Sequence, residues 1–337
     1  MYQKAIENVY KRLGDAEHMY LIHVQVGWST SAEVDQQRPM EFMFEEPVFA
    51  HETDGLTMGA TYRLGGVSQA PYNYLNLAFH VGDQPEAVKE NRAIIADYLG
   101  VSPSRITNAN QVHGLNVVEV TRDNVGAGAF DLAAAIQDTD ALMTREKDIP
   151  LFLFTADCVA IGIYDPVHQV IAVVHAGWKG TIGHLPAKTI HAMAERYGTK
   201  AEDCQVFLGP SISPDSFEVN QELADRFSRE EAQWSFDDDA LAEVHTMGGQ
   251  GLSTESVVSY KKRPGVDHVT PHVDLWTFNV KSLVEIGVKA EHITVSGTDS
   301  MTEPLCYSYR REEGRTGRMA LFAMLHSQDT KPHRKEK

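Results

Sequence analysis

The sequence has few cysteines, no long apolar run and a shortage of positive charge. Only three cysteines, Cys158, Cys204 and Cys306, occur among 337 residues. Such an odd, sparse set cannot build a disulfide framework and is typical of free thiols in a reducing compartment. No apolar run approaches the roughly 18 residues of a membrane-spanning helix. The charged N-terminus lacks an apolar core, so we expect no signal peptide. These absences predict a cytoplasmic protein without a membrane span.

The charge balance limits the classes of partner. The chain has 30 Lys and Arg against 47 Asp and Glu, for a formal net charge of −17. This excess disfavours nonspecific binding to nucleic acid or to anionic membranes, and an anionic substrate would need a local positive site. An apolar content of 42% suits a sizeable core in one large domain or two. We expect small-molecule substrates, and the oligomeric state is left open.

The pattern along the chain predicts three segments. Residues 1–45 carry the weakest pattern, with a short helix over Ala5–Leu13 and a polar linker over Ser29–Pro39. We take them as an N-terminal extension, either loosely ordered or loosely attached. Residues 46–328 form the catalytic domain, and residues 329–337 form a solvated tail.

Strands and helices are expected throughout the catalytic domain. Apolar, β-branched runs between turn residues predict strands, and capped runs with helical periodicity predict helices. The expected strands include Leu56–Leu64, Ile106–Val112, Asn116–Val120, Thr139–Met143, Leu151–Phe154, Val159–Tyr164, Gln169–Val174, Val206–Leu208, Ile293–Ser296 and Met319–Leu325. The expected helices are Pro85–Leu99, Leu185–Tyr197, Asn220–Phe227 and Leu275–Ile286, while residues 228–272 are ambiguous.

Three metal-competent side chains stand near the ends of predicted strands. Cys158 follows one strand, His175 ends the next but one, and His113 lies in the segment Gln111-Val112-His113-Gly114. Two imidazoles and one thiolate, with a fourth position left for water, would suit a catalytic zinc. Their spacings match no zinc finger. Taken singly, each residue also fits a structural role, as a hydrogen-bonded histidine or a buried apolar cysteine.

Several short motifs occur in an order that resembles a known family. They are T-x-R-L-G-G-V-S (61–68), L-N-L-A-x-H-V-G-D (75–83), N-Q-V-H-G (110–114), T-A-D-C (155–158), V-H-A-G-W-K-G-T (174–181), G-P-S-I (209–212), E-V (218–219) and S-Y-R-R-E-x-G-R-T-G-R-M (308–319). Together they resemble the YfiH or laccase-domain family, also called the multicopper polyphenol oxidase family and related to the human protein FAMIN. The resemblance covers about residues 47–327.

The resemblance implies a fold, a cofactor and an activity. It implies an α+β fold, a compact α-β-β-α sandwich. It implies one catalytic zinc held by His113, Cys158 and His175, with copper binding possible in vitro. It also implies a purine nucleoside phosphorylase that uses adenosine, inosine and 5′-methylthioadenosine with phosphate, and that deaminates adenosine.

Other residues are expected to act on the substrate. The resemblance implies Arg63 as a substrate or phosphate contact, and its place before Gly65-Gly66 would let backbone and guanidinium approach an anion. Lys179 and Arg310 are further candidates for phosphate, although the family usually has an arginine in place of Lys179. Asp157 is a candidate proton shuttle for deamination, or else a residue that orients His113 or His175. Asn76 and His80 are expected to contact substrate.

A second departure from the family lies before Ser308. Many members carry a Cys-Thr pair nearer Asp299, whereas here the cysteine is Cys306. No role for Cys306 is therefore expected.

The rival reading is a copper-dependent polyphenol oxidase. A laccase needs several coppers, including a histidine-rich cluster. The chain has 15 histidines, but it has no H-x-H pair and no H-C-H run. One site of two histidines and one cysteine cannot hold four coppers, so the zinc nucleoside enzyme is the favoured reading. A third class, a non-catalytic interaction protein, is weaker, since an open metal site is costly to retain without use.

Overall fold

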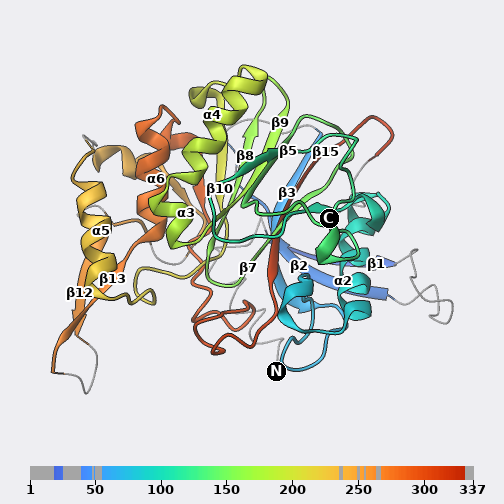
Figure 1. The fold of residues 1–337 in the computed structure, drawn as a ribbon, viewed down its shortest axis with the longest axis horizontal. Coiled ribbons are helices and arrows are strands. Elements are labelled where there is room, and N and C mark those ends of the chain that lie inside the picture. The colour runs from blue at the N-terminus through green and yellow to red at the C-terminus, as the bar shows by residue number, and fades with distance from the viewer. Residues whose placement is uncertain are drawn as a thin grey trace.

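Two β-sheets form the centre of the structure, a computed structural model shown in Figure 1. The structure describes residues 19–25, 39–47, 49, 55–234, 238–248, 251–253, 256–262 and 267–330. The predicted helix over Ala5–Leu13 and the predicted tail from Lys331 lie outside these residues. Within them are five α-helices, and the predicted α+β class is confirmed.

The first sheet has six strands, and β15 is an inner strand with β3 on one side and β7 on the other. Its strands, in spatial order, are β1 (Met19–Gln25), β2 (Pro39–Glu45), β3 (Leu56–Gly65), β15 (Met319–Leu325), β7 (Leu151–Thr155) and β4 (Thr107–Asn108). The last strand of the chain thus lies between β3 and β7 and pairs antiparallel with both. This arrangement brings the segment before β15 close to the end of β7.

The second sheet has seven strands, with the hairpin of β8 and β9 near its centre. In order they are β11 (His245–Thr246), β14 (Ile293–Val295), β10 (Gln205–Leu208), β8 (Val159–Asp165), β9 (Val170–Ala176), β6 (Ala141–Thr144) and β5 (Val117–Glu119). A separate hairpin of β12 (Val258–Lys262) and β13 (Val269–Val273) lies in the segment whose structure the sequence leaves ambiguous.

Alternating side chains bring the two sheets together. In β8, Ala160 and Tyr164 join the apolar cluster that also contains Leu321 and Ala323 of β15. The intervening residues of β8 point the other way, into a second cluster. Period-two alternation in a strand that is buried on both faces explains the continuous apolar runs seen in the sequence. At Gly162 of β8, an added Cβ would lie 2.4 Å from the sulfur of Met58, so close packing requires glycine there.

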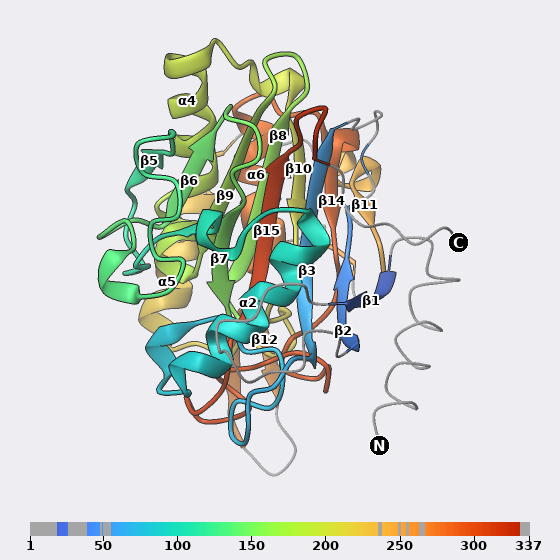
Figure 2. The same cartoon turned by 90° about the vertical axis from the view of Figure 1, so that its right-hand side faces the viewer.

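Helices pack against the outer faces of both sheets, as the turned view in Figure 2 shows. Helix α2 (Pro85–Leu99) joins an apolar cluster with Phe152 and Phe322 of the first sheet. Helices α4 (Leu185–Tyr197) and α6 (Leu275–Glu285) share a cluster with β8 and β9 of the second sheet. Two further helices are α3 (Trp178–Ile182) and α5 (Gln221–Glu231). No helix in the described ranges is long and apolar enough to span a membrane.

Local signals set the helix limits. Pro85 occupies the first turn of α2, and Gly100 ends it in the left-handed region with φ 72°. Both features are favoured at those positions. The bounds of α2 and α4 agree with those expected. The strand expected over Ile106–Val112 is shorter, because β4 covers Thr107–Asn108 alone, and the remainder forms the loop that carries His113.

The predicted N-terminal extension contains part of the core. Strand β2 pairs with β3 in the first sheet, and β1 pairs with β2. Phe42 and Phe44 are fully buried, with ring centroids 5.4 Å apart, and both contact Tyr98 of α2. A boundary after residue 45 therefore cuts a strand from the sheet to which it belongs. Burial of these rings makes β2 a part of the domain.

Candidate active site

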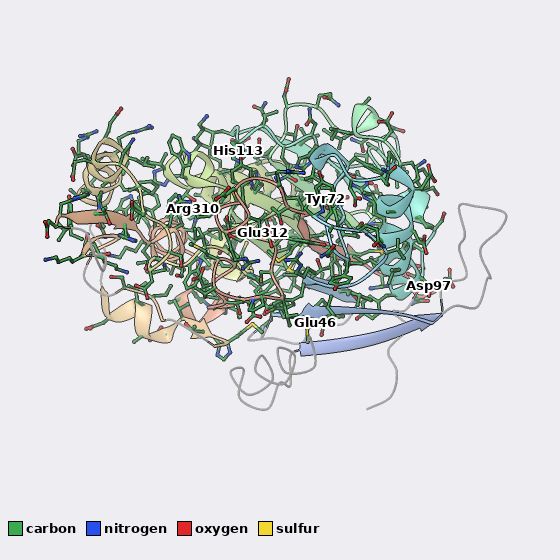
Figure 3. All side chains as sticks on the ribbon, turned by 90° about the horizontal axis from the view of Figure 1, so that it is seen from below. Glu46, Tyr72, Asp97, His113, Arg310 and Glu312 are labelled. Carbon is green, nitrogen blue, oxygen red and sulfur yellow. The ribbon has the colours of Figure 1, made fainter. Side chains whose placement is uncertain are left out.

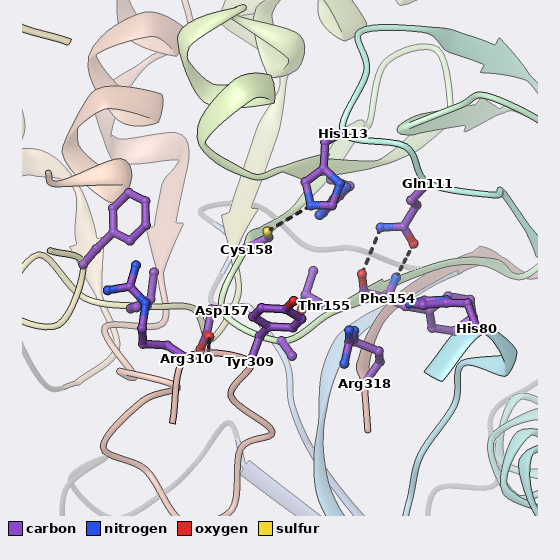
Figure 4. A pocket seen from close by; sticks show the side chains of 14 residues that line it. His80, Gln111, His113, Phe154, Thr155, Asp157, Cys158, Tyr309, Arg310 and Arg318 are labelled. Atoms are coloured by element: carbon purple, nitrogen blue, oxygen red, sulfur yellow. Dashed lines mark hydrogen bonds between the residues drawn. The ribbon is translucent and has the colours of Figure 1, made fainter. Parts of the chain in front are cut away.

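The three predicted metal ligands lie together. Cys158 lies in the turn just before β8, His175 lies near the end of β9, and His113 lies in the loop after β4. Their ligand atoms are all within 4.8 Å of one another. The Cys158 Sγ and His113 Nε2 atoms are 3.9 Å apart (Figure 4). The antiparallel pairing of β8 with β9 sets Ala160 opposite His175 and so brings the thiol beside the imidazole.

Gly177 allows the close approach of these ligands. A Cβ at this position would be 2.9 Å from Cys158 Sγ and 3.1 Å from His113 Cδ2. Any larger residue would displace both side chains. The glycine of the H-A-G-W motif is therefore required by packing against the cluster.

One carboxylate, that of Asp140, orients both histidines. Its Oδ1 lies 2.7 Å from His175 Nδ1 and accepts a hydrogen bond of 3.0 Å from the backbone N–H of His113. Its Oδ2 accepts from the backbone N–H groups of Val112 and Gly114. These bonds hold His113 at φ 57°, a left-handed conformation that is uncommon for histidine. They also leave Nε2 of His175 for a ligand.

The protonation states suit metal binding. Partial burial raises the pKa of Cys158, but His175 and His113 outweigh it and lower that pKa to about 6. Burial lowers the pKa of His175, whereas Cys158 and Asp140 raise it, to about 9 overall. The metal-free cluster at neutral pH is thus a thiolate beside an imidazolium. A metal cation would replace the imidazolium proton as the partner of the thiolate.

The donor set fits zinc. Zinc–sulfur and zinc–nitrogen bonds of about 2.3 and 2.0–2.1 Å in a tetrahedron place ligand atoms roughly 3.3–3.6 Å apart. The ligand atoms all lie within 4.8 Å of one another, and Cys158 Sγ and His113 Nε2 are 3.9 Å apart, so small side-chain shifts would reach that geometry. Among the described residues, this is the one group of three or more such side chains close enough to hold a metal ion.

The cluster opens on a pocket of about 480 Å³, a size that suits a small organic ligand. The pocket is lined by His80, Gln111, His113, Phe154, Thr155, Ala156, Asp157, Cys158, His175, Ile212, Phe217, Tyr309, Arg310 and Arg318. Figure 3 shows His113 and Arg310, which are distant in sequence, in the same part of the molecule. The segment before β15 supplies Tyr309, Arg310 and Arg318, so the far end of the chain completes the site.

Two arginines of the pocket stack on aromatic rings. The Arg310 guanidinium lies 5.6 Å from the centre of the Phe217 ring and donates two 3.2 Å hydrogen bonds to the Glu218 carbonyl. Arg318 lies 5.7 Å from the centre of the Tyr309 ring and donates to the carbonyls of Thr316 and Gly317. Because these contacts hold the cations without a carboxylate, their charge is available to an anion in the pocket.

Asp157 lines the pocket but its carboxylate is already bound. Ser300 Oγ donates to Oδ1 at 2.6 Å, and the backbone N–H of Arg310 donates to Oδ2 at 2.7 Å. Its φ of 89° is held by these bonds. Asp157 contacts neither imidazole in this network, so the orienting role considered for it belongs to Asp140, at least for His175.

Three of the predicted substrate residues lie outside the pocket lining. Arg63 is buried, donates to Glu312 Oε1 at 2.8 Å and stacks on the Tyr307 ring. Asn76 is fully buried and bonds Asp83 and the backbone of Ala78 and Arg318. Lys179 lines a different pocket. Arg63 and Asn76 therefore lie outside the lining, and the hydrogen bonds described for their side chains go to other protein groups.

His80 and Gln111 complete the wall beside Phe154. His80 lies in the short 3-10 helix Phe79–Val81, where desolvation and the nearby Arg318 lower its pKa to about 4. It is therefore a neutral imidazole at pH 7. Gln111 exchanges two hydrogen bonds with the backbone of Phe154. This pair fixes the loop that carries His113 to the end of β7.

The sequence gives no role to Asp140, Arg318 or Tyr309. Arg318 and Tyr309 stand inside the quoted motif S-Y-R-R-E-x-G-R-T-G-R-M, and this was the one available signal for them. Asp140 is far in sequence from both histidines that it orients. Its role depends on the pairing of β6 with β9, which places the start of β6 next to the end of β9.

Comparison with known proteins agrees with the geometry. Residues 57–326 match the family described as multi-copper polyphenol oxidoreductase laccase. The chain is 33% identical over 265 residues to "Purine nucleoside phosphorylase YlmD" of Bacillus subtilis. These residues make up 78% of this chain and 86% of that protein. It is 34% identical to the "Purine nucleoside phosphorylase" of Deinococcus radiodurans over 77% of this chain and 85% of the relative.

Two solved structures share the fold. The YfiH protein of Bacillus licheniformis superposes with a TM-score of 0.71 at 28% identity, over 84% of this chain and 96% of that one. YlmD of Geobacillus stearothermophilus gives 0.69 at 29% identity, over 84% and 100% of the respective chains.

Proposed function

Since the chain belongs to the multi-copper polyphenol oxidoreductase laccase family, we propose that it is a zinc-dependent purine nucleoside phosphorylase. Its substrates would be adenosine, inosine and 5′-methylthioadenosine with phosphate, and it would also deaminate adenosine. The relatives named purine nucleoside phosphorylase support the phosphorolysis. The sparse, free cysteines support action in the cytoplasm.

The observation that carries the proposal is a single metal cluster at one wall of a pocket lined by two arginines. His113, Cys158 and His175 would hold the zinc. When bound, zinc supplies Lewis-acid chemistry and lowers the pKa of a bound water to about 7. The pocket of about 480 Å³ has space for a nucleoside, and its aromatic and apolar residues suit a purine ring.

For phosphorolysis, the protein must place phosphate against C1′ of the ribose. Arg310 and Arg318 line the pocket and are held without carboxylate partners in the contacts described above. We assign phosphate binding to these two residues in place of Arg63. Positioning and charge are the main contributions that such groups make to a transfer with an anionic nucleophile. His80, being neutral, would contact substrate through hydrogen bonds.

Deamination requires a proton carrier. Among the described residues that line the pocket, Asp157 is the one carboxylate. Ser300 and the Arg310 backbone now donate to its oxygens, so proton transfer would require one of these bonds to open. Asp157 therefore remains our candidate for the shuttle, and it also links the Arg310 segment to the Cys158 turn.

The oxidase reading follows from the family description alone. A multicopper oxidase needs a histidine-rich cluster for three coppers and a separate electron-entry site. The part of the chain that the structure describes contains one three-ligand group. This count favours a mononuclear metal enzyme.

One assay tests the proposed function. Purified protein would be incubated with adenosine or inosine, with and without phosphate, and the products separated by chromatography. We expect free base only with phosphate, and inosine from adenosine without it. Absence of base release from both nucleosides in the presence of phosphate would refute the phosphorylase.

A further inference from the structure

A second pocket lies next to the metal cluster, and none of its residues has a role in the proposed reaction. It has a volume of about 530 Å³ and is lined by Leu115, Trp178, Lys179, Ile182, Gly183, Arg226, Arg229, Glu230 and Gln233. Three of these residues are cations, although the protein has a net charge of −17. A local group of cations against an acidic background is the signature of a site for an anion.

Two of the cations are arranged around one indole ring. Lys179 Nζ lies 5.6 Å and Arg226 Cζ lies 5.4 Å from the centre of the Trp178 ring. Because Trp178 belongs to α3 and Arg226 to α5, the ring joins cations from two helices. One indole thus positions both cations in the lining of the pocket, and both residues are exposed and so accessible to an anion from solvent.

None of Lys179, Arg226 and Arg229 forms an ion pair with another residue in the described ranges. The single acidic group of the lining, Glu230, accepts a 2.9 Å hydrogen bond from Gln233. A surface arginine near the end of a helix is favoured by the helix dipole, which accounts for Arg229. That effect does not account for Lys179 or Arg226.

The pocket shares its walls with the metal loops. Leu115 follows His113 by two residues, and Trp178 follows His175 by three. Gly183 packs tightly on Leu115, since an added Cβ would be 2.5 Å from its side chain. The site is therefore built on rigid elements, with Lys179 turned into it by the helix that starts after Gly177.

We propose that this second pocket binds a phosphate group, either as inorganic phosphate or as the phosphate of a monoester such as a 5′-nucleotide. Arg226 and Arg229 offer planar forks and Lys179 a point charge, which are the usual donors to phosphate oxygens. The site is distinct from the pocket that contains Arg310 and Arg318, and it does not depend on the proposed phosphorolysis.

The test measures binding without turnover. Zinc-loaded protein is titrated at fixed ionic strength with inorganic phosphate and, separately, with adenosine 5′-monophosphate, by calorimetry and by tryptophan fluorescence. The variants are Lys179→Gln and the double change Arg226→Gln with Arg229→Gln. Arg122→Gln is the matched control, because Arg122 is an exposed arginine that pairs with Glu146 and does not line this pocket. Arg318→Gln removes a proposed phosphate contact of the first pocket, so the binding that persists in this variant belongs to the second pocket.

We expect the double variant to weaken binding of at least one probe by tenfold or more, and Lys179→Gln by about fivefold, at roughly 1.4 kcal/mol per tenfold change. Arg122→Gln should leave this binding within twofold. The probe that binds more tightly identifies the source of the phosphate. The proposal is overturned if the double variant binds both probes as the wild type does, or if Arg122→Gln weakens them equally. Neither result bears on whether nucleosides are phosphorolysed.

Discussion

The Oδ1 atom of Asp140 lies 2.7 Å from Nδ1 of His175 and also accepts a hydrogen bond from the backbone of His113. One carboxylate therefore orients two of the three ligands of the metal cluster. Contacts of this kind fix the tautomer and the direction of a metal-binding imidazole.

Replacing Asp140 with Asn should weaken metal binding while all three ligands remain. Loss of such a partner typically costs 10–100-fold in metal affinity or activity. We expect Asp140→Asn to need about 10–100 times more free zinc for half-maximal activity, as measured by titration against a metal buffer. Asp123→Asn, at an exposed aspartate, is the control and should match the wild type. If Asp140→Asn bound zinc as tightly as the wild type, the orienting role of Asp140 would be refuted.

Replacing Cys158 with Ala should abolish bound zinc and nucleoside turnover and leave the chain folded. A catalytic site contributes less to folding than a closed structural one. Metal analysis after dialysis and circular dichroism measure the two effects. Cys204→Ala is the control: Cys204 is buried in the apolar cluster that includes residues of β10, so this variant should retain its metal. Full zinc occupancy in Cys158→Ala would contradict the ligand assignment.

Changes at Arg63 and Arg318 should have different effects. Arg63→Ala removes one of the two arginine partners of Glu312 and a stacked contact with Tyr307. It should lower stability by about 1–3 kcal/mol and reduce both reactions together. Arg318→Gln should reduce phosphorolysis of inosine by roughly ten- to a hundredfold, for a contact of about 1.5–3 kcal/mol.

The ratio of phosphorolysis to deamination separates the two variants. Deamination uses water and not phosphate, so loss of a phosphate contact should lower this ratio in Arg318→Gln and leave it unchanged in Arg63→Ala. The opposite pattern would restore Arg63 to the phosphate role.

The thiol of metal-free protein should react at unusually low pH. The neighbouring imidazoles lower the pKa of Cys158 to about 6, compared with about 8.5 for a free cysteine. Because the thiolate is the reactive form, alkylation by iodoacetamide should rise through a midpoint near pH 6 and be level above it. Asp140→Asn should raise the midpoint, since Asp140 helps to keep His175 protonated. A midpoint above pH 8 in the wild type would show that the thiolate is not stabilised.

Local signals were sufficient to predict much of the fold. Proline at the start and glycine at the end gave the bounds of α2, and similar signals gave α4. Strand β2 was missed because its short run beside a polar segment has no partner until β3 pairs with it. Helix α3 was missed because five residues show too little periodicity.

The candidate site was predicted in part. The motifs gave the three ligands, which the fold brings together. They could not place Lys179 or Arg63, because side-chain direction depends on tertiary structure. Lys179 follows the H-A-G-W motif, yet α3 turns it into the second pocket. Arg63 lies beside two glycines, yet Glu312, from the other end of the chain, binds it.

Titration of metal-free protein with zinc tests the central claim most directly. Phosphate-dependent release of hypoxanthine from inosine would be followed as zinc is added to a known concentration of chain. We predict that activity rises linearly and stops at one equivalent, since one group of three ligands is present in the described residues. Activity in fully metal-free protein, or a requirement for several equivalents of copper, would contradict the account.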